Sequence, residues 1–180
     1  SRLMEDILKE IEELKSSGYK EITLLGQNVN AYGNDLNLGY NFETLLRKVA
    51  QTGIERIRFT TSHPWNFTDG MINAIKDYPN VMPYVHLPLQ SGDTEILRRM
   101  GRRYTSEEYL NLYNKIRNTV PGVSISTDII VGFPNETEED FKDTCNLSEY
   151  VRFINMHIFP YSERPGTDAA SLPDKVPKSV

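Results

Sequence analysis

Apolar positions recur along this chain at the spacings of strands and helices, in alternation. Short strand-like stretches begin near residues 21, 56, 84, 124 and 153. Between them, apolar residues repeat at the three- and four-residue spacing of an amphipathic helix. We therefore predict strands at 21–25, 56–60, 84–87, 124–131 and 153–159, each separated from the next by helix. That order is typical of right-handed βαβ units with a parallel sheet.

Local signals mark where several helices begin and where the regular pattern ends. The run from Thr105 to Glu108 has the spacing of a capping box, and a further helix is predicted from Thr137 onward. Pro, Gly, Ser and Asp accumulate after Ser162, which predicts a loop leading out of the domain at 163–180. The five units have no Gly-rich dinucleotide fingerprint. They favour an α/β fold of the partial TIM-like (β/α) barrel type over 1–162, with sites at the carboxyl ends of the strands.

Composition narrows the class of protein. The 180 residues suffice for one α/β domain, and 38% hydrophobic and 25% charged residues are typical of a globular chain. No apolar run approaches membrane-spanning length, and the first residues have no signal-peptide core. The net charge of −5 argues against a dedicated nucleic-acid binding module, so we expect any RNA contact to hold the reacting base.

The single cysteine, Cys145, excludes an internal disulfide and any multi-cysteine metal site, and it indicates a reducing compartment. We expect it to be a buried packing residue beside Phe141. His86 and His157 lie in predicted strands and are expected to be ordinary, partly buried imidazoles. No metal ligand is predicted within the chain.

Polar and glycine-rich segments follow all five predicted strands. They are GQNVN at 26–30, TSHP at 61–64, LPLQSG at 87–92, GFPNET at 132–137 and FPYS at 159–162. Each alone is explained by turn formation. Because the carboxyl ends of parallel strands meet at one rim, five such segments together predict a ligand pocket there.

These segments resemble one family closely, the MiaB-type tRNA methylthiotransferases of the radical S-adenosylmethionine superfamily, which make 2-methylthio-adenosine in tRNA. The matching segments are LLGQNVNAYG at 24–33, RIRFTTSHP at 56–64, HLPLQSG at 86–92 with MGRRYT at 100–105, STDIIVGFP at 126–134, and YSERPGT at 161–167. Together they cover essentially the whole chain in order.

The resemblance implies a transferase that binds S-adenosylmethionine at the rim of a partial barrel and cleaves it reductively with a 4Fe-4S cluster. The resulting radical would take hydrogen from C2 of an isopentenyladenosine beside the tRNA anticodon, where a methylthio group is then placed. The cluster loop and first strand would precede Ser1, and both an auxiliary-cluster domain and an RNA-binding domain would lie outside the chain. The fragment alone is therefore expected to be inactive and to bind the cofactor weakly. Asn135 stands where the family usually has glycine, which puts the shape of that turn in doubt.

Carried over by position, the resemblance places Gly26 and Gln27 near the methionine amino group and Gln90 and Ser91 at the ribose. The cofactor adenine would meet the segment from Ile130 to Gly132. The full set of expected cofactor-binding residues is Gly26, Gln27, Ser62, Gln90, Ser91, Arg102, Ile130, Val131, Gly132, Phe159 and Tyr161. Arg98, Arg99, Arg102 and Arg103 form a dense basic cluster that suits the cofactor carboxylate or RNA phosphate. No catalytic side chain is assigned.

Two alternatives remain at this point: a related methylthiotransferase that modifies a ribosomal protein, and a non-catalytic ligand-binding barrel. Either way, a cytoplasmic protein is expected. The predicted strand at 21–25 would also present an unpaired sheet edge, which predicts self-association through that edge.

Overall fold

The computed structural model describes residues 1–60, 62–177 and 179, and these form two compact units. The first unit contains Ser1–His86 and Lys115–Ser124, and the second contains Leu87–Asn114 and Ile125–Val180. Thr61, in the predicted loop after the second strand, and Lys178 and Val180, in the predicted exit segment, lie outside the described residues.

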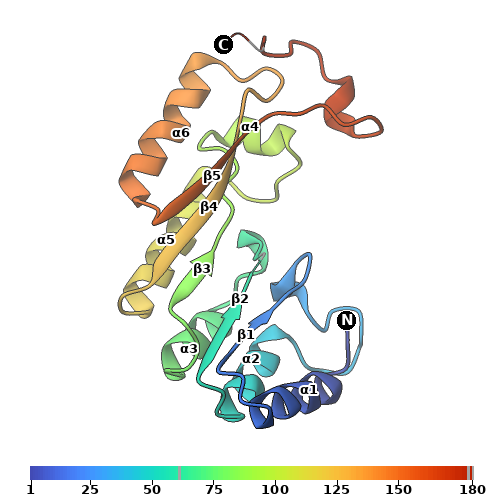
Figure 1. Cartoon of the computed structure of the whole chain (residues 1–180). Coiled ribbons are helices and arrows are strands. Elements are labelled where there is room, and N and C mark those ends of the chain that lie inside the picture. Colours follow the sequence, from blue (N-terminus) through green and yellow to red (C-terminus); the bar gives the residue numbers. More distant parts are fainter. Residues whose placement is uncertain (61, 178, 180) are drawn as a thin grey trace. The chain divides into compact units, whose positions relative to one another are not determined.

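The first unit is built on two parallel strands. Strand β1 (Glu21–Leu24) pairs with β2 (Arg56–Phe59) so that Ile22 lies opposite Ile57 (Figure 1). Helices α1 (Met4–Ser16), α2 (Phe42–Gln51) and α3 (Asp69–Asp77) and strand β3 (Tyr84–His86) belong to the same unit. Backbone bonds also join the segment before β3 to β2, because the Ile57 N–H donates to Asn80 at 2.8 Å and the Met82 N–H donates to Ile57 at 2.9 Å.

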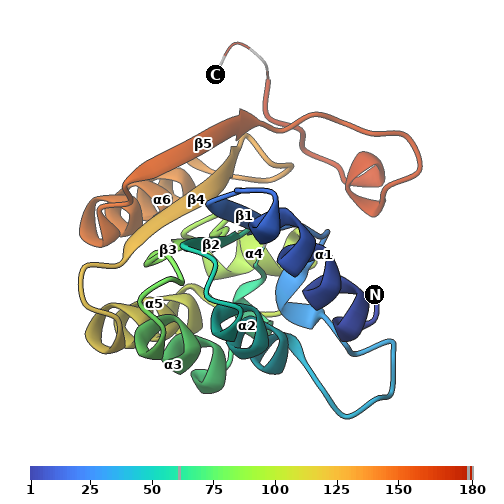
Figure 2. The same cartoon turned by 60° about the horizontal axis from the view of Figure 1, so that its bottom comes forward.

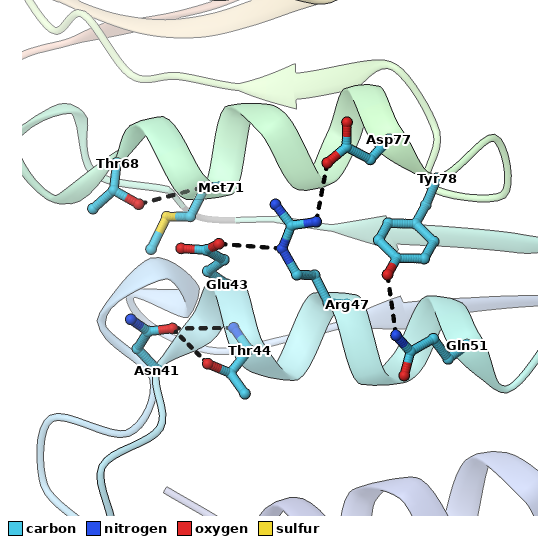
Figure 3. Close-up of polar contacts among 9 residues, drawn as sticks. All are labelled: Asn41, Glu43, Thr44, Arg47, Gln51, Thr68, Met71, Asp77 and Tyr78. Atoms are coloured by element: carbon cyan, nitrogen blue, oxygen red, sulfur yellow. Dashed lines mark hydrogen bonds and ion pairs between the residues drawn. The ribbon is translucent and has the colours of Figure 1, made fainter.

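Side-chain caps begin α2 and α3, and one arginine of α2 joins the two helices (Figure 3). Asn41 caps α2 by accepting from the Thr44 N–H at 3.0 Å, and Thr68 caps α3 through the Met71 N–H at 3.3 Å. Such caps satisfy N–H groups that a helix leaves without partners at its first turn. Arg47 on α2 bonds Glu43 one turn earlier at 3.1 Å and Asp77 on α3 at 3.0 Å.

The second unit contains the longest strand. Strand β4 (Ser124–Val131) pairs in parallel with β5 (Asn155–Pro160), and Figure 2 shows the two strands side by side with α6 (Glu138–Val151) along them. Helices α4 (Thr94–Arg99) and α5 (Ser106–Thr119) precede β4. Two capping boxes begin α5 and α6, one joining Thr105 with Glu108 and the other Thr137 with Asp140. The capping box predicted at Thr105 is thus confirmed.

A glycine allows α6 to approach the segment after β3 very closely. The Gly92 N–H donates to Thr144 Oγ1 at 2.8 Å. A Cβ on Gly92 would lie 2.5 Å from the Thr144 Cα and 2.6 Å from the Asp143 carbonyl oxygen. Glycine is therefore required here by packing, since any side chain would overlap the backbone of α6.

The five predicted strands are present with small shifts at their ends. The last one begins at Asn155 and not at Phe153, because Arg152 ends α6 in the left-handed conformation (φ 52°) and the chain needs two further residues to enter the sheet. Two predictions of burial were wrong. Cys145 is only half-buried, since the buried stripe of α6 is formed by Thr144, Leu147 and Val151. The side chain of His157 is 52% exposed, because β5 has a neighbour on one side only among the described strands.

Candidate functional site

The segment after β1 borders an open cavity. Gly26 and Gln27, which were predicted to contact the cofactor, are exposed and line a cavity of about 690 Å³ together with residues of α1. The apolar residues Ile11 and Leu24 and the basic residue Arg2 also line it. The cavity thus combines a glycine-containing segment with apolar and basic side chains.

The segments after β1 and β2 are fixed to each other by one buried side chain. Asn30 is only 4% exposed; its amide donates to the His63 carbonyl at 2.8 Å and its carbonyl accepts from the His63 N–H at 2.9 Å. The His63 ring stacks on Trp65 with centroids 4.4 Å apart. Ser62 is buried beside them, and its hydroxyl has no hydrogen-bond partner among the described residues. A buried polar atom without a partner costs free energy, so it indicates a position where a ligand or water is bound.

In the second unit, the segment after β3 extends along β4. The Gln90 N–H donates to Asp128 at 2.8 Å, and the Ile130 N–H donates to Gln90 at 2.9 Å. Gln90 adopts φ 73°, a left-handed conformation that is strained for a residue with a side chain. Ser91 is fully buried, and its hydroxyl lies 3.3 Å from Thr144 Oγ1. Gln90 therefore lies at the strand ends, as expected for a ligand contact, whereas the Ser91 hydroxyl takes part in the packing of α6.

A second cavity, of about 390 Å³, opens at the carboxyl ends of β4 and β5. Three of the predicted residues line it, namely Val131, Gly132 and Tyr161. Pro160, the last residue of β5, lines it as well. The Tyr161 hydroxyl is buried without a partner in the described part of the chain, and its ring meets Phe133 edge-on at 5.2 Å. The other two predicted residues of these strands, Ile130 and Phe159, lie directly opposite each other in the β4–β5 register.

Glu136, which sequence reasoning did not select, is the half-buried one of two glutamates that line this cavity, the other being the exposed Glu138. One carboxylate oxygen accepts a hydrogen bond from the Gly132 N–H, and the other is buried with no partner among the residues described. Burial raises the pKa of Glu136, although backbone hydrogen bonds from Gly132 and Phe133 act in the opposite direction. The preceding residue, Asn135, has φ 68°, a conformation that asparagine tolerates better than most residues. The turn in doubt is thus left-handed.

The predicted basic cluster divides into paired and unpaired side chains. Arg98 and Arg99 both bond Glu95, at 2.7 Å and 2.9 Å, and these bonds lower the pKa of Glu95 to about 2. The Nε atom of Arg102 is buried and has no partner in the described residues, whereas Arg103 is exposed. Arg102 is therefore the cation of this cluster best placed to bind an anionic group.

The predicted cofactor-binding residues fall in both units. Gly26, Gln27 and Ser62 belong to the first unit, and the second holds Gln90, Ser91, Arg102, Ile130, Val131, Gly132, Phe159 and Tyr161. Three of them, Ser62, Arg102 and Tyr161, have a buried polar atom without a partner in the part of the chain that the structure describes. Among the described residues, no group of His, Cys, Asp or Glu side chains could hold a metal ion, and no helix is long and apolar enough to cross a membrane.

Parallel strands joined by helices, with polar segments and cavities at the carboxyl ends of the strands, define an α/β protein that binds its ligand at those ends. Residues 1–148 match the Radical SAM superfamily, and the chain belongs to that family. Solved structures share its fold. The radical S-adenosylmethionine methyltransferase TsrM from Kitasatospora setae has a TM-score of 0.73 at 17% identity, over 94% of this chain and 33% of that one. Coproporphyrinogen III oxidase from Escherichia coli has a TM-score of 0.62 at 16% identity, over 98% of this chain and 41% of that one. The predicted fold class is confirmed.

Curated relatives are much more similar in sequence. The tRNA-2-methylthio-N(6)-dimethylallyladenosine synthase of Malacoplasma penetrans is 53% identical over 99% of this chain, and that of Acetivibrio thermocellus is 54% identical over 100%. The chain spans 37% and 38% of the lengths of these two relatives, respectively. The predicted resemblance is thereby confirmed.

Proposed function

We propose that this chain is the central part of a transferase that places a methylthio group on C2 of isopentenyladenosine beside the anticodon of tRNA. The observation that carries the proposal is the identity of 53–54% along the whole chain to enzymes named for the product of that reaction. The chain spans little more than a third of those enzymes, so the proposal concerns the intact parent, and the fragment alone is expected to be inactive.

S-Adenosylmethionine is the proposed cofactor, and the residues present fit it. The cavity at the ends of β4 and β5 offers Val131 and Gly132 for the adenine ring, with the Tyr161 hydroxyl and the backbone from Phe159 to Tyr161 at its edge. Ile130 is kept as a proposed contact of the adenine, from the face of β4 opposite to that of Val131. A buried hydroxyl without a partner and an apolar wall are what a nucleobase requires of a pocket.

The remaining parts of the cofactor are assigned to residues of both units. Gln90 and Ser91 are proposed at the ribose and Gly26 and Gln27 at the methionine amino group, and Ser62 and Arg102 are proposed as further cofactor contacts. Ser62 and Arg102 are supported by their unpartnered buried atoms. Ser91 is the least supported, because its hydroxyl already contacts Thr144. When bound and reductively cleaved, the cofactor supplies a 5′-deoxyadenosyl radical, and these residues bind and orient it.

The described residues do not fit a 4Fe-4S cluster. Such clusters need several thiolates, and the only cysteine is the half-buried Cys145 of α6. We therefore assign the cluster ligands to other parts of the parent and derive no step through the cluster here.

The proposed macromolecular partner is the anticodon loop of tRNA. The chain carries a net charge of −5, and two of the four arginines of the basic cluster share one carboxylate, Glu95, which offsets one of their two charges. This favours a role in holding the base, with most phosphate contacts made elsewhere in the parent. A cytoplasmic location is proposed because the proposed substrate is tRNA.

Self-association of the fragment is proposed through β1. This strand pairs only with β2 among the described strands, and Leu25 next to it is 77% exposed. An open strand edge with exposed apolar side chains invites pairing with another chain. Sedimentation of the fragment should show dimers or larger species, and a monomer at high concentration would contradict this.

The test of the function uses the full-length parent with its clusters reconstituted. The enzyme is incubated with S-adenosylmethionine carrying a deuterated methyl group, tRNA bearing isopentenyladenosine, and ribosomal proteins in parallel. Nucleoside mass spectrometry should show a methylthio group with the label on the tRNA adenosine. Label in a ribosomal protein alone would favour the related methylthiotransferase, and no label in either would contradict both functions and leave a ligand-binding barrel.

A further inference from the structure

A row of three polar side chains lies on one face of the β4–β5 pair. Asp128 on β4 is directly opposite His157 on β5, and Asp128 Oδ1 is 3.2 Å from His157 Nδ1. On the far side of the imidazole, Asn155 Nδ2 is 2.9 Å from His157 Nε2. Because side chains two residues apart on a strand share a face, Ile130 and Phe159 continue this face toward the carboxyl ends of the two strands, whereas Val131 and Pro160, which line the cavity there, belong to the opposite face.

The two contacts of the imidazole determine its tautomer. The Asn155 amide nitrogen can only donate, so His157 Nε2 must accept. The ring proton is then on Nδ1, where it is donated to the Asp128 carboxylate. His157 is thus held in one orientation by a neighbour at each nitrogen, and it orients Asp128 in turn.

The environment of the row is suited to recognition of a ligand. The side chain of Asp128 is 27% exposed and that of His157 is 52% exposed, so both are accessible yet partly shielded from water. Their opposite-facing neighbours on β4, Ile125 and Ile129, are buried. Phe159, next along the same face, is 51% exposed and offers an aromatic surface of the kind on which bases stack.

A carboxylate can only accept hydrogen bonds, and its two oxygens accept up to four. A ligand bound at Asp128 must therefore present a donor. Isopentenyladenosine keeps one N–H on its exocyclic nitrogen, and that is the donor on the polar edge of the base. Asp128 lies two residues before Ile130, or about 7 Å along the strand. A base held at Asp128 would thus be next to the site proposed for the cofactor, as its reaction requires.

We propose that Asp128 accepts a hydrogen bond from the exocyclic N–H of the target adenosine, and that His157 and Asn155 are positioning residues that orient the Asp128 carboxylate. This rests on the proposed function, because it takes an RNA adenosine as the substrate.

The test measures RNA binding by the full-length parent, by fluorescence anisotropy and without turnover. Two anticodon stem-loops are compared, one with isopentenyladenosine and one with the same base methylated on the exocyclic nitrogen so that no N–H remains. The wild-type protein should bind the methylated RNA about tenfold more weakly, the discrimination expected when one hydrogen bond to a charged group is lost. Asp128→Ala should bind both RNAs equally and weakly, whereas the matched control Asp143→Ala, an exposed aspartate on α6, should discriminate as the wild type does.

Two variants of His157 separate positioning from folding. In His157→Gln the amide can still donate to Asp128 and accept from Asn155, so discrimination between the two RNAs should be kept. In His157→Phe both bonds are lost, and discrimination should fall toward that of Asp128→Ala. Circular dichroism verifies the fold of each variant.

The outcomes distinguish the two levels of inference. If the wild-type parent modifies isopentenyladenosine but Asp128→Ala, correctly folded, still discriminates tenfold, the assignment of Asp128 is overturned and the proposed function stands. If His157→Phe discriminates as well as His157→Gln, the positioning role of His157 is overturned. If the wild-type parent neither binds nor modifies the RNA, the proposed function fails, and the assignment of Asp128 fails with it.

Discussion

Replacing Gly92 by alanine tests the close contact between the segment after β3 and α6. The added Cβ would lie 2.5 Å from the Thr144 Cα, 2.6 Å from the Asp143 carbonyl oxygen and 2.7 Å from the Thr144 backbone nitrogen. All three are backbone atoms, so relief requires α6 to move, and the 2.8 Å hydrogen bond from the Gly92 N–H to Thr144 would be stretched.

Two effects of opposite sign decide the result. Overpacking of this kind destabilises a fold by about 1–3 kcal/mol. Alanine also restricts the unfolded chain, which stabilises by about 0.4–1 kcal/mol where the backbone conformation is compatible. Because the overlap is with rigid backbone, the destabilisation by overpacking should exceed the stabilisation through the unfolded chain. We therefore expect Gly92→Ala to lower the free energy of unfolding by about 1–2 kcal/mol.

Urea unfolding followed by far-UV circular dichroism measures the loss, and hydrogen exchange resolved to α6 should show faster exchange there. Gly70→Ala on α3 is the matched control. The three atoms nearest to its Cβ all belong to the Glu43 carboxylate, the end of a flexible side chain that can move aside together with its bond to Arg47, and alanine favours a helix by up to about 1 kcal/mol over glycine. The control should be as stable as the wild type or more so. A Gly92→Ala protein that is no less stable than the wild type would refute the packing argument.

Three further predictions concern single side chains. Burial raises the pKa of Glu136, so the folded state binds the proton more tightly than the unfolded state does. The free energy of unfolding should therefore fall as the pH rises from the ordinary glutamate range through the raised pKa. Melting temperatures measured against pH should lose this dependence in Glu136→Gln, and an unchanged dependence would contradict the prediction. Thr137→Ala removes one half of a capping box and should destabilise α6 by about 1 kcal/mol in urea unfolding, while Thr137→Ser should retain most of it. Asn30→Ala removes two hydrogen bonds to the part-buried backbone of His63 and should lower the free energy of unfolding by about 1–3 kcal/mol. The fluorescence of Trp65, the only tryptophan, reports this last change, and an unaltered midpoint would contradict it.

Helix caps and turns could be predicted because their signals are local. Glycine and proline after a strand, or a threonine three residues before an acidic side chain, indicate the same local structure in most folds. Ser62, Arg102 and Tyr161 were instead proposed from the resemblance to the family, and each has a buried polar atom without a partner in the described structure. Glu136 was missed although it lies in the polar segment at 132–137, because its burial depends on the whole cavity around it. No local pattern distinguishes it from the exposed acidic residues that follow.

The order of strands and helices, their parallel direction and the position of polar segments at the strand ends were determined by the sequence itself. A period of two or 3.6 residues is a property of neighbouring positions, and it remains the same whatever the rest of the chain does. The tertiary structure alone decided which distant side chains meet. Asp128 faces His157 because a particular register of β4 and β5 is the most stable, and Gly92 meets Thr144 because α6 packs at a particular depth. Register and depth follow from the packing of all side chains in the unit together, which no local pattern contains.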